Sequence, residues 1–157
     1  MSRFAIDLGS LRQGQTRLEV EAAAQDLDLP EAGWTGPIQG AFDVEKTGES
    51  VSVRGSVTAM ARLECVRCLT AFDLRVQARL EVFTERAGRG RPGEEQALER
   101  DEYMKFHDGR QLDLRGEARE ALLLELPMVP HCREDCRGLC PRCGADLNAG
   151  PCGCPRA

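Results

Sequence analysis

The feature that most constrains this chain is a cysteine-rich segment near its C-terminal end. Six of the eight cysteines fall between His131 and Cys154, interleaved with glycines and prolines. A segment with so few apolar side chains cannot bury a hydrophobic core, so cross-links through its sulfurs must order it. Either disulfides or bound metal ions would supply these cross-links.

The spacing of the cysteines favours metal ions. Cys140 and Cys143 form a C-x-x-C pair whose proline presets a turn, and a second pair, Cys152-Gly-Cys154, lies close behind it. Two such pairs would close a tetrahedral thiolate site with no open coordination position, which is typical of structural zinc. A disulfide knot is the alternative, but no secretory signal is recognisable and cytoplasmic thiols stay reduced.

Composition limits the size, location and partners of the protein. A chain of 157 residues with 41% hydrophobic residues suits one domain, or one domain with a small appendage. No apolar run approaches the roughly 18 residues of a membrane span, so we expect a cytoplasmic protein with no membrane partner. The net charge of −5 argues against an indiscriminate nucleic-acid binder, although residues 50–91 carry eight arginines against four acids.

Alternating apolar residues predict a β-meander in the first half of the chain. From Ile38 to Val82 apolar residues recur at every second position, interrupted by the turn Thr47-Gly48-Glu49-Ser50 and by a C-x-x-C pair. This pattern predicts three long antiparallel strands that share one apolar face. We therefore predict an α+β fold, with an antiparallel β-meander body, one covering helix and a C-terminal cysteine-rich zinc-binding segment.

Three regions follow from these patterns. Residues 1–86 form the β-meander body, with a C-x-x-C knuckle at a hairpin tip. Residues 87–106 start with a run of glycines and arginines and continue with acidic residues, so we expect a flexible linker. Residues 107–157 comprise a helix between Asp113, a good N-cap, and Pro127, followed by the zinc segment, which packs back on the body.

The cysteine pair in the body, Cys65 and Cys68, is half of a zinc site and needs two more ligands. A redox dithiol of the thioredoxin type would sit at a strand-to-helix junction, whereas this pair has strands on both sides. The predicted helix would carry the next two cysteines toward the hairpin tip. We predict two zinc ions, one held by Cys65, Cys68, Cys132 and Cys136, the other by Cys140, Cys143, Cys152 and Cys154. An alternative keeps Cys132, Cys136, Cys140 and Cys143 together.

Arginines recur on the outward positions of the predicted strands and inside both cysteine segments. A solvated surface is the ordinary explanation of exposed arginines, and phosphate binding is the functional one. Metal binding would fix the guanidiniums within the cysteine segments, where their planar shape suits phosphate or guanine edges. The candidate RNA-binding residues are Arg54, Arg62, Arg67, Arg75, Arg79, Arg133, Arg137 and Arg142.

Four stretches together resemble the YceD family, the large ribosomal RNA subunit accumulation proteins. They are Cys65-Val-Arg-Cys68-Leu, the leucine-rich stretch from Arg119 to Pro127, the run from Cys132 to Asn148 with its second C-x-x-C pair, and Cys152-Gly-Cys154. The resemblance covers most of the chain. It implies a cytoplasmic factor required for normal levels of 23S ribosomal RNA or its precursor, and it brings no established catalytic mechanism.

From this resemblance we expect a non-enzymatic ribosome-biogenesis factor needed for large-subunit (23S) ribosomal RNA synthesis, processing or accumulation. Its partner would be the ribosomal RNA precursor or a pre-ribosomal particle, with no small-molecule substrate. Two alternatives stay open. One is a thiol redox protein or sensor that uses Cys65 and Cys68. The other is a protein-binding adaptor of ribosome assembly.

Overall fold

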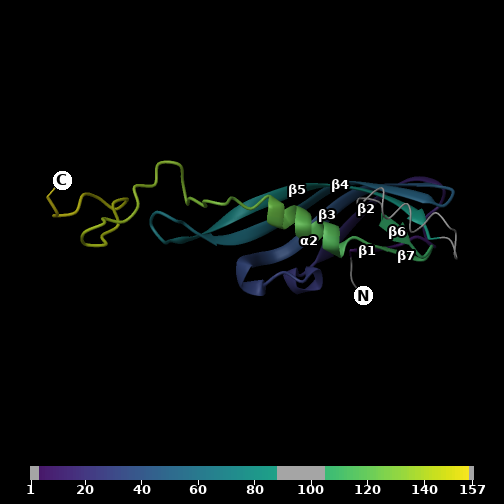
Figure 1. The fold of residues 1–157 in the computed structure, drawn as a ribbon, viewed down its shortest axis with the longest axis horizontal. Helices are drawn as coiled ribbons and strands as arrows, with labels where there is room; N and C mark the ends of the chain where they lie inside the picture. The colour runs from purple at the N-terminus through teal and green to yellow at the C-terminus, as the bar shows by residue number, and fades with distance from the viewer. Residues whose placement is uncertain (1–3, 88–104, 156–157) are drawn as a thin grey trace.

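A computed structural model describes residues 4–87 and 105–155 of the chain. The described part is built on a five-stranded sheet with strand order β2-β3-β4-β5-β6, and β1 and β7 form a second, two-stranded sheet (Figure 1). The strands are β1 (Ala5–Asp7), β2 (Gly14–Ala22), β3 (Trp34–Thr47), β4 (Ser50–Glu64), β5 (Ala71–Arg86), β6 (Lys105–His107) and β7 (Gln111–Asp113). Two short 3₁₀ turns, η1 (Ala24–Leu27) and η2 (Glu31–Gly33), lie between β2 and β3.

The predicted meander corresponds to β3, β4 and β5, with β2 as a further antiparallel strand. The β4–β5 ladder runs without a break from the Ser50–Glu85 pair to the Glu64–Ala71 pair. Residues of one parity are buried along each strand, as in Val51, Val53 and Val57 of β4, because one face of the sheet covers the core. The sheet is mostly antiparallel, but it is mixed, since β6 pairs with β5 in parallel.

One α-helix, α2 (Arg115–Leu124), is found in the described residues, and it packs against β4 and β5. Leu114, Ala118 and Leu122 are fully buried beneath it. The N-cap position is occupied by Leu114 and not by Asp113 as predicted. The Asp113 carboxylate still accepts the Arg115 N–H at 3.0 Å, so it acts one residue earlier than a standard cap.

The predicted linker, residues 87–106, falls mostly outside the described residues, which resume at Lys105. Lys105 and Phe106 are not linker, because with His107 they form β6 against Thr84–Arg86 of β5. A three-residue strand shows no alternation that a sequence could reveal, and this one is recognised by its pairing with the end of β5. Of the helices in the described ranges, none is both long enough and apolar enough to cross a membrane.

The C-terminal segment extends away from the sheet beyond the tip of the β4–β5 hairpin, at the opposite end of the molecule from β6 and β7 (Figure 1). The hairpin tip and the segment after α2 therefore meet at this end. Their apolar contacts form a small cluster of their own, made of cysteines with Phe72 and Leu139, separate from the main core.

Replacing Gly55 by alanine is expected to lower the free energy of unfolding by at least about 2 kcal/mol. A Cβ at this position would collide with the Ala41 carbonyl oxygen and would lie 2.8 Å from Phe42 Cδ1. The obstacle is backbone in the adjacent strand, so it cannot move aside without breaking the β3–β4 ladder. Urea unfolding measures the effect.

Gly116→Ala is the matched control, since nothing lies within 4 Å of its added Cβ and the residue is helical. It should leave stability unchanged or raise it by up to about 1 kcal/mol. Equal effects of the two substitutions would contradict the packing explanation for Gly55.

Candidate metal centres

The tip of the β4–β5 hairpin brings four cysteine sulfurs together. Cys65 and Cys68 come from the tip itself, and Cys132 and Cys136 come from the segment after α2. Cys65 Sγ lies 3.8 Å from Cys136 Sγ, Cys68 Sγ lies 3.7 Å from Cys132 Sγ, and all four sulfurs lie within 4.8 Å of one another. Sulfurs bound about 2.3 Å from a tetrahedral ion are about 3.8 Å apart. This proximal cluster therefore has the dimensions of a thiolate metal site.

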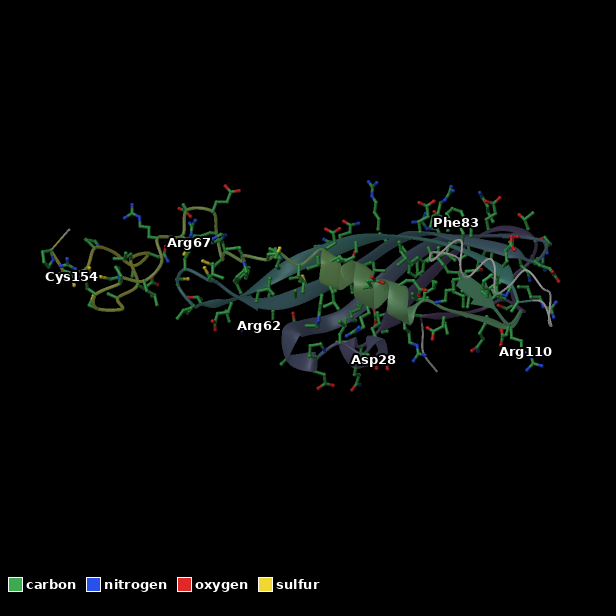
Figure 2. All side chains as sticks on the ribbon, in the orientation of Figure 1. Asp28, Arg62, Arg67, Phe83, Arg110 and Cys154 are labelled. Atoms are coloured by element: carbon green, nitrogen blue, oxygen red, sulfur yellow. The ribbon has the colours of Figure 1, made fainter. Side chains whose placement is uncertain are left out.

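The remaining four cysteines form a distal cluster, Cys140, Cys143, Cys152 and Cys154, whose sulfurs also lie within 4.8 Å of one another. Cys154 marks its position at the far end of the molecule, beyond Arg67 at the hairpin tip (Figure 2). This division is the one predicted from the number of cysteines, and the alternative grouping of Cys132 and Cys136 with Cys140 and Cys143 is wrong. Four sulfurs per cluster leave no open coordination position, as in structural sites.

The two C-x-x-C turns have the same backbone hydrogen bonds. In the first, Cys65 N–H donates to Thr70 O at 2.9 Å and Leu69 N–H donates to Cys65 O at 2.9 Å. In the second, Cys140 N–H donates to Ala145 O and Gly144 N–H donates to Cys140 O, both at 2.8 Å. The fourth residue after the first cysteine has a positive φ in both, 60° at Leu69 and 74° at Gly144. These turns point backbone N–H groups at the sulfurs, an arrangement that stabilises thiolates.

The backbone of the hairpin tip binds the tail on both sides of the proximal cluster. Val66 N–H donates to Pro130 O at 3.0 Å, and Leu139 N–H donates to Arg67 O at 3.1 Å. The Arg67 guanidinium donates through Nη1 to Cys136 O at 3.0 Å. Arg67 was a candidate RNA-binding residue by sequence, and in the structure its backbone and side chain form hydrogen bonds with the tail.

Asn148 joins the two clusters, a role that the spacing of the cysteines does not reveal. Its Nδ2 donates to Cys136 Sγ at 3.4 Å, and its Oδ1 accepts the Arg137 N–H at 2.8 Å. The side chain thus comes from the distal cluster's loop and contacts a sulfur of the proximal cluster. Asn148 belongs to the stretch that carries the family resemblance, but only the tertiary structure shows which sulfur it contacts.

The thiols of each cluster differ widely in acidity. Burial is the largest influence on Cys65 and raises its pKa, but backbone N–H groups, including that of Cys132, outweigh it and lower the pKa to about 6. Backbone N–H groups of Cys143 and Arg142 lower the pKa of Cys140 to about 6. Burial and the neighbouring sulfurs raise the pKa of Cys132 to about 12, and the Cys143 sulfur together with burial raises that of Cys154 to about 12.

Four sulfurs at these distances cannot all ionise on their own, because each negative charge raises the pKa of the next thiol. A divalent cation at the centre of the cluster would reverse this effect and deprotonate the remaining thiols. The chemistry of the donors therefore fits a bound cation in each cluster. Thiolate ligands suit zinc, copper(I) and iron–sulfur centres.

Metal binding to the metal-free protein at pH 8 is expected to release at least two protons per chain, one from Cys132 and one from Cys154. Both thiols have a pKa of about 12 and are protonated at this pH, and both must ionise to bind. Since protons compete with the metal, affinity should rise with pH. Calorimetric titration in buffers of different ionisation enthalpy counts the protons. Release of less than one proton would contradict four-thiolate coordination.

The candidate RNA-binding arginines are exposed, but several are paired. Arg54 lies 2.9 Å from Glu81, Arg62 lies 3.3 Å from Asp73, and Arg133 lies 3.5 Å from Asp135. Two of these partners are directly opposite on the neighbouring strand, so the register neutralises much of the predicted basic stripe. The candidates that form no ion pair within the described residues are Arg75, Arg79, Arg137 and Arg142, besides Arg67.

Comparison with known proteins finds one family model, described as large ribosomal RNA subunit accumulation protein YceD, that matches residues 53–157. This range contains all eight cysteines and both clusters. No solved structure matches.

Individual relatives are similar over most of this chain. An uncharacterized protein of Mycobacterium leprae is 38% identical over 126 residues, which cover 80% of this chain and 56% of the relative. Uncharacterized proteins of Mycobacterium bovis and Mycobacterium tuberculosis are each 40% identical over 150 residues, covering 96% of this chain and 60% of the relative. The chain thus spans a little over half the length of these relatives.

Proposed function

The chain belongs to the YceD family, and from this premise we propose that it is a ribosome-biogenesis factor needed for the synthesis, processing or accumulation of large-subunit (23S) ribosomal RNA. In this proposal it acts in the cytoplasm without catalysis, by binding the ribosomal RNA precursor or a pre-ribosomal particle. The single observation that carries the proposal is the family match, which spans both cysteine clusters.

We propose zinc as the ion in both clusters. All donors are sulfur, and the separations of 3.7 and 3.8 Å in the proximal cluster suit a tetrahedral ion with bonds of about 2.3 Å. Zinc has no redox chemistry, and a closed shell of four thiolates excludes substrate from the ion. The ions then serve to hold the tail in shape at the end of the hairpin. This role supports a binding protein and not a metalloenzyme.

Crosslinking to RNA in cells, followed by sequencing, tests the proposal. We expect enrichment of large-subunit ribosomal RNA or its precursor at a defined position. A Cys136→Ser, Cys140→Ser double variant, which removes one ligand from each cluster, should lose this enrichment. Crosslinks spread evenly over unrelated RNAs, or no crosslinks at all, would refute the proposal that the protein acts by binding ribosomal RNA.

A thiol redox function is favoured by one observation, the low pKa of Cys65, about 6, which makes it a thiolate at neutral pH. Metal analysis discriminates this function from ours. Protein purified without added zinc should contain about two ions per chain if eight thiolates close two sites. A metal-free chain whose thiols titrate rapidly would support redox chemistry instead.

A protein-binding adaptor is favoured by exposed apolar side chains after α2. Leu124, Met128 and Val129 are 78%, 98% and 57% exposed, and Val66 and Leu69 at the hairpin tip are also exposed. Salt dependence separates the two kinds of partner. Binding through phosphates weakens steeply as salt rises, whereas binding that persists unchanged would indicate an apolar protein interface.

A further inference from the structure

A slot lies next to the distal cluster. It encloses about 340 Å³ and is lined by three of the cluster's cysteines and by side chains of two other kinds. Its apolar walls come from Pro141, Leu147, Pro151 and Pro155, and its charged groups come from Arg137 and Arg142. An ion held by the four sulfurs would sit at about 2.3 Å from each, so it would fill only a small part of this volume.

The charged side chains that line the slot are both positive, so they favour an anionic ligand. No acidic residue is among the described residues that line it. Arg137 and Arg142 are exposed and form no ion pair with any residue in the described ranges, so their donors are free for a ligand. Guanidinium groups bind phosphate through paired N–H donors.

The apolar walls of the slot suit a flat apolar group, such as a nucleobase, that is flanked by anionic groups. Proline rings and a leucine offer surface to a nucleobase face but no hydrogen bonds that would read its edge. The volume is near the lower end of ligand sites, which suits a single nucleotide and not a folded segment. Single-stranded RNA presents this combination, because its unstacked bases turn out from a charged backbone.

The larger hollow on the exposed face of the sheet does not offer this chemistry. It encloses about 630 Å³ and is lined by Glu19 and Glu21, whose carboxylates repel phosphate. A smaller hollow of about 200 Å³ near His107 is lined by Glu49 as well as by Lys46 and Arg86. Of these three hollows, the slot beside the distal cluster is the one that combines unpaired arginines with apolar walls among the described residues.

We propose that this slot holds one unstacked base of a single-stranded RNA segment, with Arg137 and Arg142 on the flanking phosphates. The inference rests on the proposed function and makes it more specific, because it assigns the RNA contact to the distal cluster and not to the sheet. The base contact is tolerant of sequence, since the walls contact ring faces. Position on the ribosomal RNA would then be set by strand accessibility and by other contacts of the protein.

The test uses the full chain with its metal bound and two fluorescent probes, a short oligouridylate and an abasic oligonucleotide of equal length and charge. Arg137→Ala, Arg142→Ala is compared with the charge-matched double variant Arg17→Ala, Arg86→Ala. The control arginines are exposed, are paired with Asp43 and Glu49, and lie on the sheet. Metal content is measured for every variant, so that loss of binding is not confused with loss of the cluster.

We expect the slot variant to bind oligouridylate on the order of tenfold more weakly and to reduce the slope of log K against log salt by about 1.4, for two phosphates on a single strand. The control should leave both unchanged. The abasic probe should bind the wild-type protein on the order of tenfold more weakly than oligouridylate, because it has no base to bury against the proline and leucine walls.

Equal binding of the two probes would overturn the base contact, and equal behaviour of the two double variants would overturn the assignment to Arg137 and Arg142. If crosslinking of the wild-type protein to ribosomal RNA persists in cells while the slot variant crosslinks equally, the slot is wrong and the proposed function stands. If the wild-type protein neither binds the probes nor crosslinks to RNA, both fail.

Discussion

Cys140→Ser is expected to lower the metal content from two ions to one per chain and to unfold the tail from residue 140 onward. A structural zinc site supplies about 10–16 kcal/mol of apparent binding free energy, and this free energy is also folding free energy. Beyond Cys140, no described residue is fully buried, and Leu147 is only half-buried. The distal cluster therefore has no apolar core that could keep its shape without the ion.

The sheet should stay folded in this variant. Amide exchange measures both effects in one experiment, through protection of residues 51–63 and 72–82 and of the Cys140 and Leu147 amides. Ala145→Ser, an exposed conservative change in the same loop, is the control and should retain both ions. If protection in the two strands collapsed with that of the tail, the independence of the sheet from the distal cluster would be refuted.

Cys136→Ser is expected to have a different and wider effect, because it breaks the cluster that joins the tail to the sheet. The variant should lose the proximal ion and keep the distal one, so its metal content also falls from two ions to one. The hairpin tip would lose its link to the tail through Arg67, whose guanidinium donates to the Cys136 carbonyl oxygen. The contact between Asn148 and the Cys136 sulfur would be lost as well.

The position of the loss distinguishes the two substitutions, although both remove one ion. In Cys136→Ser, the amides of Leu69, Val66 and Leu139 should exchange rapidly, since their hydrogen bonds lie at the hairpin tip and its junction with the tail. In Cys140→Ser, the Val66 and Leu69 amides should stay protected. Loss of both ions in Cys136→Ser would mean that the distal cluster cannot bind metal unless the proximal cluster is intact.

The strands show which features of the fold the alternation of apolar residues could predict. Alternation along β4 and β5 fixes which side chains face the core, because the side-chain period of a strand is two and a slip by one residue would reverse the faces. The same pattern could not reveal β6, which has three residues, or show that it would pair in parallel. Its position depends on the fold of the whole chain.

For the arginines, the sequence predicted exposure but not ion pairing. Their outward parity followed from the alternation, and the structure places Arg54 and Arg62 on the exposed face as predicted. Whether an exposed arginine is free depends on the residue across the strand pair, and the register puts Glu81 and Asp73 there. Register is decided by the two strands together, so no single strand's pattern can show which guanidiniums remain unpaired.

Local spacing and the number of ligands that a tetrahedral ion requires were enough to predict two C-x-x-C turns and two four-sulfur sites. The three-dimensional arrangement was needed to show that Asn148 contacts a sulfur of the other cluster, that Arg67 binds the tail, and that Arg137 and Arg142 line one slot. Those contacts join residues from separate turns and strands. Their distances are set by how the hairpin tip and the tail pack in space, which local spacing does not encode.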